Sequence, residues 1–360
     1  MLEHRAVVLG SDRVGALGAL AGGVPHPGVV RGVGRSGVSP VFVFPGHGAQ
    51  WVGMGAELLE REPVFAEAMA ECHRALEPFT DFSLLGVVRG EGAELERAEV
   101  EQPVLWAVMV SLARLWASVG VVPSAVVGHS LGEIAAAVVA GGLSLEDGAR
   151  VVALRARVIA EELVGLGGMV SLGVSRGVAE ELVGGWEGVS VAAVNGPGST
   201  VVSGDVAGVE GVLAHCEGVG IRARRVAIDY ASHGVQVERV RERLLGVLGS
   251  VSPVSSVVPF YSSVSGGRRD TAGLDAGYWY DNLRSAVRFG DVTDVLLAEG
   301  RTVFLEVSAH PVLAVGVQES MEAAGRAGVV LGTLRRGEGG LQRWVTALAE
   351  AHVHGVPVNW

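Results

Sequence analysis

The chain has 360 residues, 49% of them hydrophobic, which is enough for a large core and for more than one compact unit. Its net charge of −11 argues against a nucleic-acid partner, and no apolar stretch is long enough to suggest a membrane span. Two cysteines and no secretory signal predict no metal site, no disulfide framework and a cytoplasmic location.

The N-terminal part predicts a strand at 6–9, a helix at 13–22 and a Gly- and Pro-rich linker that reaches Pro40. Val41–Phe44 is the first expected core strand, and Pro45-Gly46 ends it. Helices are expected further along the chain, the second of them with a proline in its first turn. The ranges of these helices are 54–76, 103–119 and 145–163.

The pentapeptide Gly128-His129-Ser130-Leu131-Gly132 stands between the apolar run Ala125–Val127 and an Ala-rich segment that begins at Glu133. A strand, a tight Gly-x-Ser-x-Gly turn and a helix together are the context of a nucleophilic serine. The new helix also aims its unpaired N–H groups at any oxyanion formed there. The sequence therefore predicts Ser130 as a nucleophile; the alternative is an ordinary turn with a capping serine.

Residues 169–229 have a different rhythm, because short strands and helices alternate there in the order β-α-β-β-α-β. This order predicts a small ferredoxin-like unit inserted into a larger α/β unit. The chain is expected to return to the larger unit with a helix near 234–248 and a strand at Val303–Val307. The elements expected in the small unit are strands at 169–174, 189–194, 200–203 and 221–228 and helices at 177–184 and 206–218.

A serine nucleophile needs a base, and His233 is the best placed of the ten histidines because it follows the last strand of the small unit. His129 is interpreted as packing and polar support beside the nucleophile. The glycine-rich loop around His47 predicts a backbone donor to an oxyanion, and the amide after the nucleophile, at Leu131, is a second. Arg155 either reaches out to water or turns inward as a fork for a carboxylate.

Several segments together resemble the acyltransferase domain of modular type I polyketide synthases and, more distantly, malonyl-CoA:acyl carrier protein transacylases. They occur in the family's order over nearly the whole chain. The matching segments are Val41–Met54, Gly128–Glu133, Leu154–Arg157, Asn195–Gly198, Tyr230–His233, Tyr278–Arg284 with Val287–Phe289, and Phe304–Pro311.

The resemblance implies an α/β-hydrolase-like subdomain over 41–166 and 231–332, with a ferredoxin-like subdomain over 167–230 inserted in it. Residues 1–40 are expected to be the remnant of a linker from a ketosynthase, and residues 333–360 the start of the linker that follows an acyltransferase.

The resemblance also assigns roles to residues. It makes Ser130 and His233 a catalytic dyad, with backbone amides of His47 and Leu131 as the oxyanion hole. It makes Arg155 the residue that binds the free carboxylate of a malonyl-type acyl group. It implies that a backbone carbonyl oxygen, and not an aspartate, orients the imidazole of His233, and the segment around His310 is expected to supply it. The other residues expected to contact substrate are Gln50, His129, Asn195, Tyr230 and Ser232.

Residue 47 departs from the family pattern, and two signals of substrate choice conflict with each other. Residue 47 is His where the family commonly has Gln. Tyr230-Ala231-Ser232-His233 resembles the methylmalonyl-selecting form, whereas Leu131 is more typical of malonyl-selecting domains. We favour methylmalonyl, because Ser232 leaves open the space that a phenylalanine would fill in malonyl-selecting domains. Malonyl and larger 2-alkylmalonyl units are alternatives.

The expected reaction is transfer of an acyl unit from acyl-CoA to the phosphopantetheine arm of an acyl carrier protein through an acyl-serine, without a cofactor. A neighbouring ketosynthase is the other expected partner. A serine thioesterase or another hydrolase shares the nucleophile and the base, and a non-catalytic docking module for carrier proteins needs neither.

Overall fold

A six-stranded sheet forms the centre of the larger unit in this computed structural model, which describes residues 2–34, 37–92 and 94–360. Residues 35–36 of the predicted linker lie outside the described residues. The strand order is β10-β9-β4-β3-β11-β12, and every neighbouring pair is parallel except β10 with β9. The strands are β3 (Val41–Phe44), β4 (Ala125–Gly128), β9 (Phe260–Ser262), β10 (Gly267–Arg269), β11 (Val303–Glu306) and β12 (Val329–Gly332).

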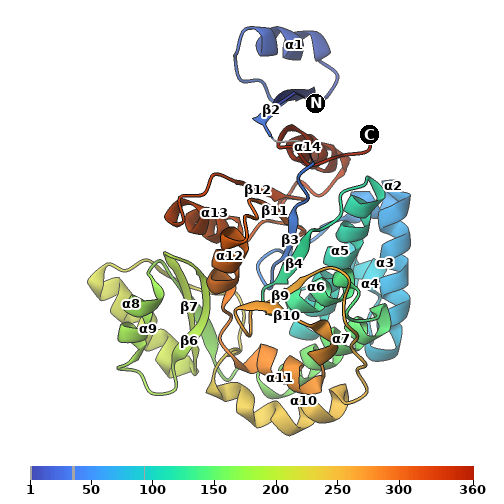
Figure 1. Ribbon diagram of the computed structural model, residues 1–360. Helices are drawn as coiled ribbons and strands as arrows, with labels where there is room; N and C mark the ends of the chain where they lie inside the picture. The colour runs from blue at the N-terminus through green and yellow to red at the C-terminus, as the bar shows by residue number, and fades with distance from the viewer. Residues whose placement is uncertain (1, 35–36, 93) are drawn as a thin grey trace.

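Both faces of this sheet are covered, so its central strands are continuous apolar runs. Phe42 and Phe44 face a core built with α5 and α6, whereas Val41 and Val43 face α12, α13 and the small unit (Figure 1). The helices of the larger unit are α2 (Ala56–Arg61), α3 (Pro63–Leu76), α4 (Leu84–Val88), α5 (Ala98–Ser118), α6 (Gly132–Ala140), α7 (Leu145–Glu162), α10 (Arg241–Leu248), α11 (Ala276–Arg284), α12 (Phe289–Ala298) and α13 (Ala314–Ala323).

Three expected helices differ from the observed ones. The helix expected at 103–119 begins earlier, at Ala98, so Pro103 lies inside α5 and not in its first turn. The helix expected near 54–76 is two helices, α2 and α3, because the chain is extended at Glu62 and restarts at Pro63. The helix expected at 234–248 begins with a 3₁₀ segment, Val235–Val240, before α10. Short 3₁₀ turns also occur at Glu77–Phe79 and Thr271–Gly273.

The small unit has the expected β-α-β-β-α-β order and forms an antiparallel sheet, β6-β7-β5-β8. Its last strand is shorter than expected, because the chain leaves the sheet after Arg225 and turns toward the larger unit. The fold class predicted from the sequence is therefore confirmed. The elements are β5 (Gly168–Leu172), α8 (Arg176–Val183), β6 (Ser190–Gly196), β7 (Ser199–Gly204), α9 (Val206–Val219) and β8 (Ala223–Arg225).

A backbone bridge joins the small unit to the larger one. The Val287 amide donates to the Ala192 carbonyl at 2.8 Å, and the Val194 amide donates to the Val287 carbonyl at 2.9 Å. Strand β6 is thereby fixed to the segment between α11 and α12.

The N-terminal segment folds as a hairpin instead of crossing the surface as a plain linker. The strand β1 (His4–Val8) and the helix α1 (Arg13–Ala21) agree with the expected elements, but β2 (Val29–Val33) lies inside the predicted linker. This hairpin packs on α14 (Leu341–Val353), where Arg5 Nη1 donates to the His352 carbonyl at 2.8 Å (Figure 1). In the described ranges no helix has the length and apolarity to cross a bilayer.

The turn between β4 and α6 is held by close backbone contacts. A Cβ on Gly132 would lie 2.0 Å from the Phe44 carbonyl oxygen, and a Cβ on Gly128 would lie 2.2 Å from the Glu133 amide nitrogen. The His129 amide also donates to the Phe44 carbonyl at 2.9 Å. Only glycine on both sides lets β3 and the turn come this close, and Ser130 between them takes a left-handed φ of 52°.

We expect Gly132→Ala to lower the free energy of unfolding by about 3 kcal/mol, because the new methyl group would clash with rigid backbone. Urea unfolding measures this change. Gly177→Ala in α8 is the matched control, since nothing lies within 4 Å of a Cβ there, and it should leave stability unchanged or slightly higher. Equal stabilities for the two variants would contradict the role of the close contact.

Candidate active site

The Ser130 hydroxyl and the His233 imidazole meet just beyond the carboxyl end of strand β4, although 103 positions separate them in the chain. Ser130 Oγ lies 2.8 Å from His233 Nε2, and both side chains are buried. Ser130 has a φ of 52° and His233 a φ of 59°, and in the described chain these are the only non-glycine residues with positive φ. Backbone strain of this kind gathers at functional sites, and here it directs both side chains toward one point.

The other ring nitrogen of His233 is held by backbone. His233 Nδ1 lies 2.9 Å from the carbonyl oxygen of Ser285, so a proton on Nδ1 is donated there and Nε2 is left free to accept from the serine. The expectation that the segment around His310 orients the imidazole is wrong. His310 Nδ1 accepts from the Arg336 amide at 3.2 Å, which stabilises the loop beyond β11.

Burial makes the imidazole a neutral base. Desolvation lowers the pKa of His233 to about 3, and the nearby His129 and Arg155 act in the same direction. The imidazole is therefore uncharged near neutral pH and can accept the serine proton.

Two backbone amides beside Ser130 are free to bind an oxyanion. Neither the Leu131 amide nor the His47 amide donates to an acceptor in the described part of the chain. The loop that carries His47 packs on the turn, since a Cβ on Gly46 would lie 3.9 Å from Ser130 Cβ. This pair fits the expected oxyanion hole.

Arg155 lies in α7 and turns inward, so the fork interpretation describes its orientation. Its side chain is 1% exposed. Nη1 donates to Asn282 Oδ1 at 2.6 Å and Nη2 donates to Gln102 Oε1 at 3.3 Å, while Nε has no partner in the described chain. Burial lowers the pKa of Arg155 to about 10, so the guanidinium stays charged near neutral pH.

Asn282 connects this guanidinium to the nucleophile. Asn282 Nδ2 donates to the Ser130 carbonyl at 3.3 Å and to Glu133 Oε2 at 2.9 Å. The buried Glu133 carboxylate also accepts from the Tyr278 hydroxyl at 2.5 Å and from the Ser263 hydroxyl at 2.9 Å. Burial raises the pKa of Glu133, whereas these hydrogen bonds lower it.

A cavity of about 240 Å³ opens at Ser130 between the two units. The predicted substrate residues His129, Asn195 and Ser232 line it, together with His47 and His233. His129 Nε2 lies 2.8 Å from Asn195 Oδ1, so these two side chains position each other across the two units. The remaining lining residues are Gly46, Met169, Ser171, Ala193, Ser199, Val201, Val226, Ile228, Val312 and Leu313.

The other predicted substrate residues lie outside the lining of this cavity. Tyr230 is buried, and its hydroxyl lies 2.9 Å from His47 Nε2 and accepts from Gln102 Nε2 at 3.0 Å. Arg155 donates to Asn282, which is also outside that lining. Gln50 Oε1 accepts from the Gly48 amide at 2.7 Å, so its carboxamide closes its own loop.

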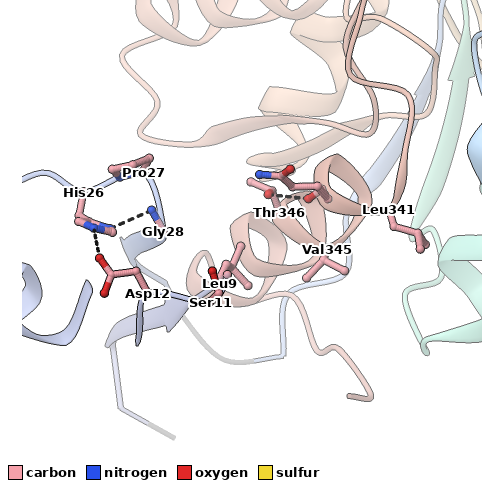
Figure 2. A pocket seen from close by; sticks show the side chains of 11 residues that line it. Leu9, Ser11, Asp12, His26, Pro27, Gly28, Leu341, Val345 and Thr346 are labelled. Carbon is pink, nitrogen blue, oxygen red and sulfur yellow. Dashed lines mark hydrogen bonds and ion pairs between the residues drawn. The ribbon is translucent and has the colours of Figure 1, made fainter. Parts of the chain in front are cut away.

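A larger cavity, of about 640 Å³, lies between the N-terminal hairpin and α14 (Figure 2). A serine, an aspartate and a histidine line it, but His26 Nδ1 accepts from the Gly28 amide at 3.0 Å and His26 Nε2 faces Asp12 at 3.8 Å. His26 is thus engaged by its own loop, and the chemistry belongs to the smaller cavity.

Comparison with known proteins decides the family. The model of the family described as "Acyl transferase domain" matches residues 41–358. The chain belongs to this family. The acyltransferase domain from module 8 of the salinomycin polyketide synthase has a TM-score of 0.97 at 52% identity, over 100% of this chain and 86% of that one. The malonyl CoA-acyl carrier protein transacylase of Coxiella burnetii has a TM-score of 0.77 at 27% identity, over 87% and 98%.

The curated relatives are polyketide synthase proteins. The spectinabilin polyketide synthase system protein NorC of Streptomyces orinoci is 56% identical over 366 residues, which cover 100% of this chain and 16% of that protein. The pikromycin polyketide synthase component PikAII of Streptomyces venezuelae is 51% identical over 362 residues, covering 99% and 9%. This acyltransferase domain therefore corresponds to a small part of much longer relatives.

Sequence reasoning missed four residues of the site of this acyltransferase domain. Asn282 lies in a segment that the family resemblance includes, and Gln102 directly precedes the expected start of a helix. Glu133 is the one acidic residue in an otherwise apolar helix, which could have indicated a buried polar contact. Ser285 acts through its carbonyl, so no side-chain pattern could have found it.

Burial lowers the pKa of His47 to about 3, well below its unfolded value of about 6.5. The unfolded chain therefore binds a proton that the folded chain excludes as the pH falls from about 6.5 toward 3, and stability falls with it. We expect His47→Gln to lose less unfolding free energy on acidification, by up to about 1.4 kcal/mol per pH unit. Urea unfolding between pH 7 and pH 4 measures it.

The matched control is His215→Gln, because His215 is exposed on α9. Its profile should follow the parent. A His47→Gln profile parallel to the parent would show that the His47 imidazole is not held neutral.

Proposed function

We propose that this acyltransferase domain loads a malonyl-type extender unit, with methylmalonyl favoured, from acyl-CoA onto the phosphopantetheine arm of an acyl carrier protein. One observation carries the proposal. A buried guanidinium that forms no ion pair in the described chain is joined through Asn282 to the backbone of a serine that lies 2.8 Å from a neutral histidine. A hydrolase of uncharged esters has no use for such a charge.

In the first half-reaction, His233 Nε2 takes the proton of the Ser130 hydroxyl while Oγ attacks the thioester carbonyl carbon. The amides of His47 and Leu131 hold the oxyanion. The carbon–sulfur bond then breaks, and the coenzyme A sulfur leaves with the proton from His233. The acyl group is now an ester on Ser130.

In the second half-reaction, the carrier's phosphopantetheine thiol gives its proton to His233 and its sulfur attacks the ester carbonyl. The bond to Ser130 Oγ breaks, and the proton returns to that oxygen. Arg155 binds the free carboxylate in both halves and so fixes where the carbonyl lies. The reaction needs no cofactor.

Two features bear on the acyl unit and support different choices. Ser232 lines the cavity, and its small side chain leaves space for an α-substituent. Its hydroxyl donates to Met169 Sδ at 3.2 Å. Leu131 is the feature more typical of malonyl domains. We weight Ser232 more, because its side chain lines the cavity. Malonyl and larger 2-alkylmalonyl units are the alternatives.

The partners follow from the family. We propose an acyl carrier protein domain as acceptor and a ketosynthase as neighbour within a longer synthase. We also propose that residues 1–40 and 333–360 are parts of the linkers around an acyltransferase made of the larger subdomain, 41–166 and 231–332, and the small one, 167–230. The match of this chain to 16% of a longer relative supports a place within a longer synthase, and the family model begins at residue 41, although it extends through 333–358.

The test is competitive acylation with malonyl-, methylmalonyl- and ethylmalonyl-CoA, read by intact-mass spectrometry. We expect a persistent adduct of methylmalonyl mass that passes to a carrier domain and is absent in Ser130→Ala. Rapid release of free acid would favour a hydrolase. Absence of any adduct with intact carrier binding would favour a docking module.

We expect Arg155→Ala to lower kcat/KM for methylmalonyl-CoA by about 30- to 1,000-fold or more, because loss of a buried charge partner costs about 2–5 kcal/mol. Transfer of an uncharged acyl group such as propionyl should persist. Steady-state transfer to a carrier domain with both substrates measures the change. Unchanged methylmalonyl transfer would refute the carboxylate role.

We expect Ser232→Phe to shift selectivity from methylmalonyl toward malonyl by about 10- to 200-fold, because the ring fills the space of the α-methyl group. Ser232→Ala is the control, since it removes the hydroxyl without filling space, and it should keep the parent's preference. The competitive acylation assay reads both. An unchanged ratio in Ser232→Phe would place the α-substituent elsewhere.

A further inference from the structure

The hydrogen-bond partners of Arg155 are neutral side-chain amides. Its Nη1 and Nη2 donate to the oxygens of Asn282 and Gln102, and no Asp or Glu pairs with it in the described chain. Exposed arginines behave differently here: Arg243, for example, pairs with two glutamates. A buried cation without an anion is costly, so this arrangement needs a reason beyond stability.

Both amides are fixed in the orientation that points oxygen at the guanidinium. Asn282 Nδ2 donates to Glu133 Oε2 at 2.9 Å and to the Ser130 carbonyl at 3.3 Å, so a flipped amide would face an acceptor with an oxygen. Gln102 Nε2 donates to the Tyr230 hydroxyl at 3.0 Å. The Ser130 carbonyl and Glu133 therefore hold the Asn282 oxygen toward Arg155. The Gln102 oxygen is held there by the guanidinium itself, which can only donate, while the Tyr230 hydroxyl accepts from the other end of that amide.

Asn282 also keeps the Glu133 carboxyl group out of contact with the Arg155 guanidinium. It lies between the Glu133 carboxylate and the Arg155 guanidinium and contacts both. An amide oxygen orients the fork of an arginine without cancelling its charge, whereas a carboxylate in the same place forms an internal ion pair. That ion pair would compete with any carboxylate that enters the site.

We propose that Gln102 and Asn282 are positioning residues whose neutrality keeps the Arg155 charge available, so that the free carboxylate of the substrate is its first anionic partner. This inference rests on the proposed function. It makes the two amides determinants of selectivity for carboxylated over uncharged acyl groups, although neither lines the cavity at Ser130.

The experiment exchanges each amide for the carboxylate of the same shape. Gln102→Glu adds a negative charge beside Arg155 and leaves Asn282, with its hydrogen bonds to Ser130 and Glu133, unchanged. We measure single-turnover acylation of Ser130 by methylmalonyl-CoA and by propionyl-CoA, which lacks only the carboxylate. The selectivity ratio is the second-order rate constant of acylation by methylmalonyl-CoA divided by that for propionyl-CoA. This ratio should fall about 100-fold, the size expected when a buried charge loses its partner.

Two controls separate charge from structure. Gln342→Glu adds the same charge on the exposed face of α14 and should behave as the parent. Gln102→Met keeps neutrality but removes the hydrogen bonds, and its ratio should stay within about fivefold of the parent. Equal losses of the ratio in Gln102→Met and Gln102→Glu would overturn the proposal, because hydrogen bonding alone would then explain the effect.

Asn282→Asp places a carboxylate beside the other guanidinium nitrogen, Nη1. It becomes the deciding variant if thermal unfolding shows that Gln102→Glu does not fold. Its ratio should also fall about 100-fold, with slower acylation by both substrates because the donor to Ser130 is lost. A ratio equal to the parent in the variant that folds would refute the inference.

Arg155→Ala tells the two failures apart. If Arg155→Ala keeps methylmalonyl transfer, the proposed function fails. If it loses that transfer while Gln102→Glu and Asn282→Asp keep the parent's ratio, only the inference fails.

Discussion

The hydrogen bond between Ser130 and His233 depends on two strained backbones. Both residues have left-handed φ values, 52° and 59°, which cost about 1–3 kcal/mol each. The surrounding structure holds them there. Gly132 packs against the Phe44 carbonyl on the serine side, and the His233 amide donates to the Leu283 carbonyl at 2.8 Å on the other. Contacts of the backbone therefore fix the positions of both Ser130 and His233.

One short segment, residues 282–288, ties the parts of this site together. Asn282 contacts Ser130 and Arg155, and Leu283 and Ser285 hold the two ends of His233 with their carbonyls. Val287 pairs with strand β6 of the small unit. Ser130, His233, Arg155 and the small unit thus all contact one stretch of the chain.

The electrostatics of the site follow from its burial. Desolvation lowers the pKa of His233 and His47, so both imidazoles are neutral near neutral pH, and it makes the buried Arg155 charge costly, a cost that the nearby Glu133 offsets in part. A neutral base and a cation that no Asp or Glu pairs with in the described chain favour a reaction in which a serine attacks an anionic substrate. The two amides beside Arg155 maintain this state, because they satisfy N–H groups without adding negative charge.

The sequence by itself determined the fold class and pointed to Ser130 as the candidate nucleophile. The strands Val41–Phe44 and Ala125–Val127, the Gly-x-Ser-x-Gly turn and the β-α-β-β-α-β order are local patterns, and local patterns are readable in one dimension. The candidates His233 and Arg155 needed the family resemblance, because spacing alone did not distinguish either from an ordinary surface residue.

Only the tertiary structure decided how these residues meet. It showed that Ser285 and not the His310 segment orients the imidazole, and that Asn282 joins Arg155 to Ser130. It also turned Arg155 inward, closed Gln50 on its own loop and placed β2 in the predicted linker. These contacts join residues far apart in the chain, some of them through backbone atoms that every residue has, so no pattern of side chains could encode them.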